Sequence, residues 1–183
     1  MKIKRIGTYV WLMFVFSILF SCVEEQDFNQ YDDLSITPTY EASVLYLEVP
    51  ESTINDLPAP DTYSREFEFE AFSETVFADR VLEGVLTYYV ENTTSKPLEL
   101  EIRFLDATGN VLATEVFELD PEPSAEVIRE TYYGPYGEDI DIIRNISSIS
   151  VTATNNGDNV STSSQDNPMV TLKSSGAFTV SIK

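Results

Sequence analysis

The segment TYYGPYGED, residues 131–139, holds the most distinctive group of side chains that could do chemistry. Tyr132, Tyr133 and Tyr136 lie there among two glycines and a proline. A tyrosine ring offers a rigid amphipathic surface, which suits stacking on a sugar ring or an anchoring contact with a partner protein. The structural alternative is a folded loop whose rings cover the end of a hydrophobic core. The segment therefore predicts a candidate ligand-binding platform, with the structural interpretation favoured.

Catalytic chemistry is restricted by the absence of histidine from the whole sequence. This absence excludes Ser-His-Asp and Cys-His catalysis, and it excludes histidine-ligated zinc. No glycine-rich phosphate loop is present. A glycosidase needs two facing carboxylates, but with 31 acidic residues some chance pair is expected in any fold. We therefore expect no enzymatic activity and no cofactor.

Calcium is the cation that the oxygen donors of this chain suit best. The candidates are weak and consist of Asp139 with Asp141, Asp158 within NNGDN, and Asp106 with Asn110. None of them matches the spaced acidic loop of an EF-hand. The favoured alternative is that each is an Asp or Asn that forms a turn. No metal is therefore predicted.

The only cysteine of the chain, Cys22, ends an apolar segment near the N-terminus. Residues 2–5 supply three positive charges, and Val10–Phe20 is an eleven-residue run that is apolar except for one serine. Such a run suits a signal-peptide core and is shorter than the roughly 20 residues of a membrane-spanning helix. A small residue, Ser21, precedes the cysteine, as a processing site requires.

Leu19-Phe20-Ser21-Cys22 resembles the bacterial lipobox, in which the cysteine is lipidated and becomes the new N-terminus. The resemblance implies that residues 1–21 are a lipoprotein signal peptide and that Cys22 carries the lipid. Several acyl chains on one residue hold a protein stably to a membrane. The acidic stretch 23–27 looks like the export signal of Bacteroidota-type surface lipoproteins. That likeness implies the cell-surface side of the outer membrane, while an anchor that faces the periplasm stays open.

The charge of the chain narrows the range of partners. Removal of residues 1–21 takes away three positive charges and no negative ones, so the formal net charge goes from −20 to −23. We expect no binding to nucleic acid, because that binding depends on neutralising phosphates. Direct docking on anionic lipid heads is disfavoured for the same reason.

Short segments in which apolar and polar residues alternate recur along the mature chain and predict β-strands. They occupy residues 42–50, 65–72, 81–92, 98–106, 111–119, 124–133 and 147–155. Residues 98–119 are predicted to form a β-hairpin. Residues 169–173 and 177–183 are predicted to form a second one around Ser-Ser-Gly. The spacing of isoleucines in 138–146 instead predicts a short helical turn.

The predicted fold is all-β, a single antiparallel β-sandwich over residues 41–183, preceded by an acidic tether over residues 22–40. The pattern of residues 84–112 is similar to Ig-like or fibronectin-III-like accessory domains of bacterial surface proteins.

Together these expectations describe a non-enzymatic, membrane-anchored envelope lipoprotein that acts as an accessory, structural or protein-binding subunit at the outer membrane. Its expected partners are the membrane, reached through the lipid anchor, and a protein of the envelope. The alternative is a surface lipoprotein that binds glycans or adheres in a calcium-dependent manner.

Overall fold

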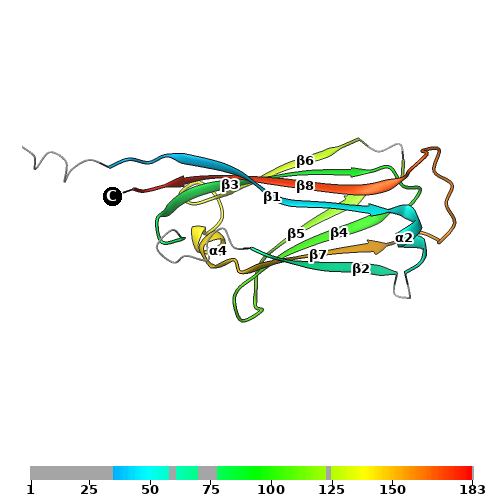
Figure 1. Ribbon diagram of the computed structural model, residues 1–183, viewed down its shortest axis with the longest axis horizontal. Coiled ribbons are helices and arrows are strands. Elements are labelled where there is room, and N and C mark those ends of the chain that lie inside the picture. Colours follow the sequence, from blue (N-terminus) through cyan, green and yellow to red (C-terminus); the bar gives the residue numbers. More distant parts are fainter. Residues whose placement is uncertain (1–34, 58–60, 70–77, 123–124, 183) are drawn as a thin grey trace, which may run out of the picture. The chain divides into compact units, whose positions relative to one another are not determined.

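The computed structural model describes residues 35–57, 61–69, 78–122 and 125–182. Two four-stranded antiparallel sheets face each other (Figure 1). The first has the order β1-β8-β3-β6 and the second the order β2-β7-β4-β5. The strands are β1 (Thr39–Pro50), β2 (Thr62–Glu68), β3 (Val81–Asn92), β4 (Leu98–Leu105), β5 (Val111–Leu119), β6 (Val127–Tyr133), β7 (Ser148–Asn155) and β8 (Met169–Val180). The all-β antiparallel sandwich is therefore confirmed.

The order of the strands differs from the one expected for an Ig-like domain. In an Ig domain, consecutive strands such as A and B are neighbours in one sheet. Here only β4 and β5 are consecutive neighbours, and every other step from one strand to the next changes sheet. Eight antiparallel strands connected in this way form a jelly roll. Alternation along single strands does not distinguish the two connectivities.

The hairpin predicted over residues 98–119 is confirmed by the pairing of β4 with β5. Its turn is held by the Asp106 carboxylate, which accepts hydrogen bonds from the backbone N–H groups of Thr108 and Asn110 at 2.8 and 2.9 Å. Gly109 has a φ of 84°, a conformation that glycine adopts without steric cost. Hydrogen bonds from the side chains of Asn110 and Thr108, with these backbone bonds in addition, hold the pKa of Asp106 well below its usual range.

The hairpin predicted around Ser174-Ser175-Gly176 is wrong, because β8 is one unbroken strand. It pairs with β1 on one side and with β3 on the other, so these residues bond to neighbouring strands instead of turning. Gly176 serves packing: a Cβ at this position would come within 2.5 Å of the Phe178 ring. The glycine marks a place where a ring lies against the backbone.

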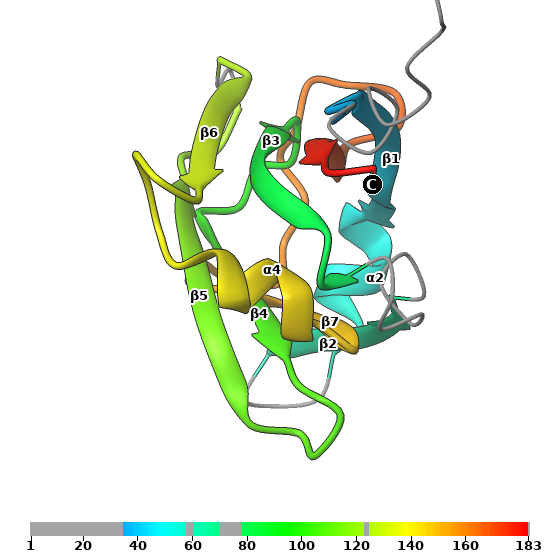
Figure 2. The same cartoon turned by 90° about the vertical axis from the view of Figure 1, so that its left-hand side faces the viewer.

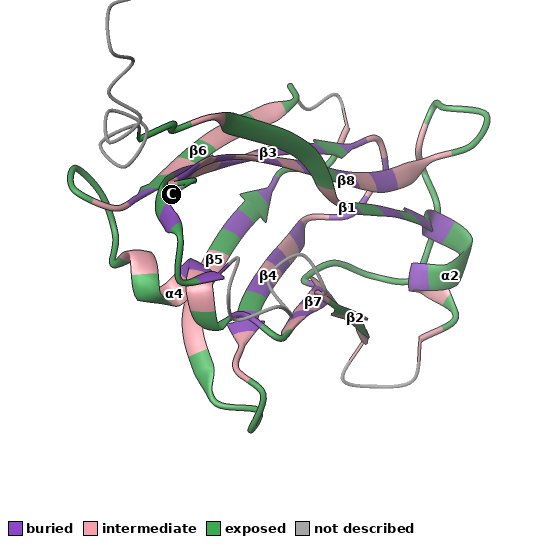
Figure 3. Ribbon diagram, turned by 60° about the vertical axis from the view of Figure 1, so that its left-hand side comes forward, coloured by how far each residue is buried: buried purple, intermediate pink, exposed green. Residues whose placement is uncertain are grey.

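The core lies between the sheets, and buried residues alternate with more exposed ones along the strands (Figure 3). On β4, Leu98, Leu100, Ile102 and Phe104 all face inward, as predicted. Tyr88 and Phe117 meet edge-to-face across the core with ring centroids 5.6 Å apart. Such an edge-to-face contact contributes stabilisation beyond that from the burial of the two rings.

Two short helices accompany the strands. The predicted helical turn is α4 (Ile140–Asn145), which crosses the end of the sandwich (Figure 2) and is fastened by Arg144, whose guanidinium donates to the carbonyl of Val81. The sequence did not predict α2 (Glu51–Asn55). No described helix is long and apolar enough to cross a membrane.

The strand β1 begins at Thr39, two residues inside the segment assigned to the tether. Just before it, Ile36 forms an isolated antiparallel bridge with Ile182. The start of β1 and the end of β8 therefore lie side by side at one end of the sandwich (Figure 1).

Candidate functional site

The predicted tyrosine loop is a tight turn at the end of β6. The N–H of Gly137 donates to the carbonyl of Gly134 at 3.2 Å, and proline follows the first glycine, its preferred place in a turn. The N–H of Glu138 donates a hydrogen bond to the carbonyl of Tyr132 at 2.8 Å. Gly137 is required here, since a Cβ would come within 2.0 Å of that same carbonyl oxygen.

The turn separates the three tyrosines, because successive residues of a strand point to opposite faces of the sheet. Tyr133 faces the core and is 2% exposed, and burial raises the pKa of its hydroxyl. Tyr132 is 55% exposed on the outer face of the first sheet, and Tyr136 at the tip of the turn is 96% exposed. The structural interpretation thus holds for Tyr133, while the other two remain available to a ligand.

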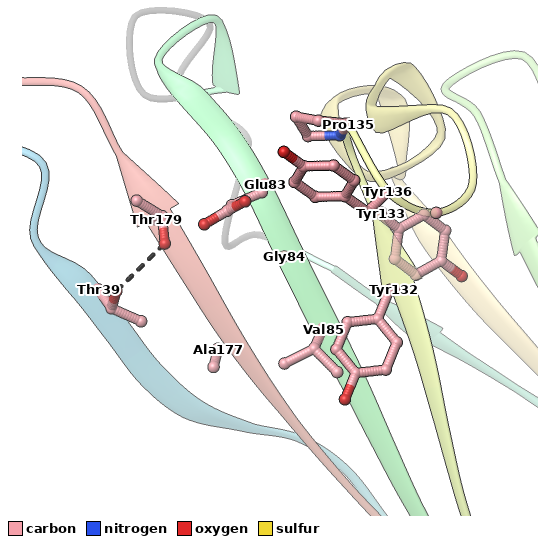
Figure 4. A pocket seen from close by; sticks show the side chains of 11 residues that line it. Thr39, Glu83, Gly84, Val85, Tyr132, Tyr133, Pro135, Tyr136, Ala177 and Thr179 are labelled. Atoms are coloured by element: carbon pink, nitrogen blue, oxygen red, sulfur yellow. Dashed lines mark hydrogen bonds between the residues drawn. The ribbon is translucent and has the colours of Figure 1, made fainter.

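Tyr132 and Tyr136 border a shallow groove of about 250 Å³ on the outer face of the first sheet (Figure 4). Small residues from the neighbouring strands lie alongside it. These are Thr39, Gly84, Val85, Ala177 and Thr179. The register of the sheet explains this lining, because Val85 of β3 is opposite both Ala177 of β8 and Tyr132 of β6.

Carboxylates accompany the rings. Glu83, beside the bulge where β3 and β8 change register, lines the groove and is exposed. Glu130 accepts a hydrogen bond from the hydroxyl of Tyr132, which raises the pKa of that tyrosine. Glu41 of β1 is opposite Ala177 and so belongs to the same cross-strand row as Val85 and Tyr132. No basic residue is among the described residues that line the groove.

Apart from Tyr132, Tyr133 and Tyr136, sequence reasoning missed the residues of this groove. Thr39, Glu83 and Ala177 are far apart in the chain and carry no local motif, so only strand pairing brings them together. The one local signal was the alternation of β3, which places residues 83 and 85 on the face opposite the core residue Leu86.

The weak calcium candidates are engaged by separate partners. The carboxylate of Asp139 caps α4 by accepting from the N–H of Asp141 at 3.0 Å, and Asp141 forms an ion pair with Arg144. Asp158 accepts from the Nζ of Lys96 at 2.8 Å. No group of three metal-ligating side chains occurs within the described ranges. Each of these acids therefore has a hydrogen-bond or ion-pair partner within the domain.

The Lys96 ammonium belongs to a buried network that the sequence did not predict. It is 1% exposed and also donates to the carbonyl of Val160 at 2.6 Å, with a carboxylate oxygen of Glu51 3.8 Å away. Glu51 is equally buried and accepts from the hydroxyl and the N–H of Ser95. Buried charges need partners, and Lys96 finds them in both the loop and α2. The network therefore connects the long polar loop 156–168 to α2 and to the β3–β4 connection.

The second predicted site, the lipidation residue Cys22, lies outside the described residues. So does most of the segment assigned to the tether.

Comparison with known proteins identifies no family: no family model and no curated protein matches the chain. Among solved structures, a VP2 subviral particle of infectious bursal disease virus matches at 13% identity with a TM-score of 0.33, over 80% of this chain and 32% of that one. Disulfide-linked pili described as Bacillus endospore appendages match at 8% identity with a TM-score of 0.38. This match covers 79% of this chain and 91% of that one. The chain spans about a third of the length of the VP2 chain. Likenesses at these scores carry no argument about function.

Proposed function

We propose that the protein is a non-enzymatic lipoprotein of the bacterial outer membrane, anchored through Cys22, that acts as an accessory or protein-binding subunit of an envelope complex. The observation that supports binding is the groove between Tyr132 and Tyr136. Exposed tyrosine rings are enriched at protein interfaces because they give a large contact area at a small entropic cost.

The position of the groove suits a partner at the membrane. Thr39 lines the groove and is also the first residue of β1, so the chain enters the domain beside the groove. Ser35 is thirteen positions after Cys22 in the chain, a distance of at most roughly 45 Å when the chain is fully extended. A lipid on Cys22 would keep the groove near the membrane surface and raise its effective concentration toward a membrane protein.

The experiment isolates the wild-type protein and Cys22→Ser from mildly solubilised membranes, then measures intact masses and identifies co-purifying proteins. We expect acyl chains on the wild type and an unlipidated precursor that retains residues 1–21 for the variant. We also expect one envelope protein at near-equal stoichiometry with the wild type. A wild type without acyl chains would refute the anchor, and a wild type that remains solitary after crosslinking would refute the subunit role.

Glycan binding at the cell surface is the second candidate, favoured by the same two exposed rings. It predicts that a purified surface polysaccharide binds the wild type. Tyr132→Ala and Tyr136→Ala should each abolish this binding, while both variants stay folded. Unchanged affinity in both variants would exclude this candidate.

A further inference from the structure

The groove combines two exposed aromatic rings with the carboxylate of Glu83, and no described residue that lines it is basic. We propose that it receives an arginine or lysine side chain, seated between Tyr132 and Tyr136, from a basic segment of the protein partner. This inference rests on the proposed protein-binding function and specifies the chemistry of the partner.

The rings supply the first attraction. A cation over the face of a tyrosine ring, within about 6 Å of its centroid, is held by the quadrupole of the ring. The same fold already uses such contacts internally: the guanidinium of Arg129 lies 4.1 Å from the ring centroid of Phe117, and that of Arg65 lies 4.8 Å from Phe67. Tyr132 and Tyr136 are the exposed rings beside the groove.

The carboxylates supply the second attraction, and they come from three strands. Glu83 lines the groove, and Glu130 accepts a hydrogen bond from the hydroxyl of Tyr132. Glu41 lies in the same cross-strand row as Tyr132. Among the outward-facing positions of the described strand pairs in this sheet, Lys173 alone is positively charged, and it lies two rows away from Tyr132. The local field is therefore negative and favours a positively charged group.

The charge of the whole chain selects between occupants. A second copy would bring another formal charge of −23 in its mature form, so self-association through this acidic face is opposed by repulsion. A neutral sugar would use the rings but leave the carboxylates without a matching charge. A basic protein segment satisfies both features.

The test uses the full mature lipoprotein in a non-ionic detergent, with tyrosine rings labelled for NMR and assigned through single Tyr→Phe variants. The probes are the peptide acetyl-Gly-Gly-Arg-Gly-Gly-amide and its counterpart with uncharged citrulline in place of arginine. We expect the arginine peptide to shift the resonances of Tyr132 and Tyr136 saturably and the citrulline peptide to leave them unchanged. Raising the salt concentration should weaken this binding.

Matched variants locate the contact. Tyr136→Ala should reduce affinity for the arginine peptide about 2- to 5-fold, the loss expected for one exposed cation–π contact, and Glu83→Gln should weaken it further. Tyr46→Ala and Glu48→Gln are the controls. This pair lies on the other edge strand of the same sheet, and the Tyr46 hydroxyl likewise donates to Glu48. Both controls should bind as the wild type does.

The inference is overturned if the citrulline peptide binds equally, if neither peptide binds, if the control variants lose as much affinity as the groove variants, or if a neutral glycan displaces the arginine peptide. Co-purification separates it from the proposed function. An envelope partner that is retained in full by a Tyr136→Ala/Glu83→Gln double variant overturns this inference and leaves the subunit role intact.

Discussion

Tyr132 and Tyr133 are neighbours in β6, yet their rings lie on opposite sides of the sheet. Tyr133 is buried against the core, and Tyr132 lies exposed beside the groove with its hydroxyl bonded to Glu130. Adjacent residues of one strand thus face the core and the groove, and substitutions can separate a role in stability from the proposed role in binding.

Tyr133→Ala should lower the free energy of unfolding by about 3–5 kcal/mol, because removal of a large buried ring leaves a cavity. Tyr132→Ala should cost less than about 1 kcal/mol, since the ring is exposed and only strand propensity changes. Denaturant unfolding of both variants measures the difference. Equal losses would contradict the assignment of the two faces.

Lys96→Met should destabilise the protein by about 3–5 kcal/mol, because it removes one partner of a buried ionic network and leaves the Glu51 carboxylate without its cation. The matched control is Lys173→Met on an exposed position, for which a change within about 0.5 kcal/mol is expected. The measurement is denaturant unfolding at neutral pH. A loss for Lys96→Met no larger than that of the control would show that the network adds little to stability.

The ion pair between Asp158 and Lys96 should be visible in the dependence of stability on pH. The hydrogen bond from Lys96 holds the pKa of Asp158 below its ordinary value of 3.8. A carboxyl group whose pKa is lower in the folded state stabilises the protein above its unfolded pKa and loses that contribution as pH falls through the folded pKa.

Unfolding curves between pH 6 and pH 2 should therefore show a gap between the wild type and Asp158→Asn that narrows as the pH falls below about 4, because the unfolded state binds the proton of this carboxyl before the folded state does. A gap of constant width would contradict the lowered pKa.

Gly176→Ala should cost about 1–3 kcal/mol, because the added methyl group would enter the space of the Phe178 ring. Combination with Phe178→Leu should recover part of this loss, which a double-mutant cycle measures as a coupling free energy. Gly109→Ala is the control: nothing lies within 4 Å of its Cβ, so its cost comes from the positive φ, and Phe178→Leu should not relieve it. Additive costs for Gly176 and Phe178 would refute the proposed contact.

Millimolar calcium and an excess of EDTA should leave the Tm of the mature protein unchanged within the error of the measurement. The reason is that Asp139, Asp141 and Asp158 already bond to separate groups of the protein. Differential scanning calorimetry with each addition checks this expectation. A rise in Tm with calcium that EDTA reverses would restore the calcium-dependent adhesin as a candidate.

Features that depend on neighbouring residues were predicted from the sequence. Alternation placed β3 at residues 81–92, identified the inward face of β4 and predicted its hairpin with β5, because side chains in a strand alternate with a period of two. The spacing of the isoleucines predicted α4, because side chains three or four residues apart share one face of a helix. Lipidation of Cys22 stays a prediction from the opening segment.

Features that depend on distant pairing were decided by the tertiary structure. Ser174-Ser175-Gly176 looked like a turn because small residues favour turns, but β1 and β3 on its two sides and the Phe178 ring above Gly176 hold it extended. The groove has the same origin. The sequence identified its tyrosines, whereas Glu83 and Thr39 reach them only through the strand order of a jelly roll, which arises from hydrogen bonds between residues far apart in the chain.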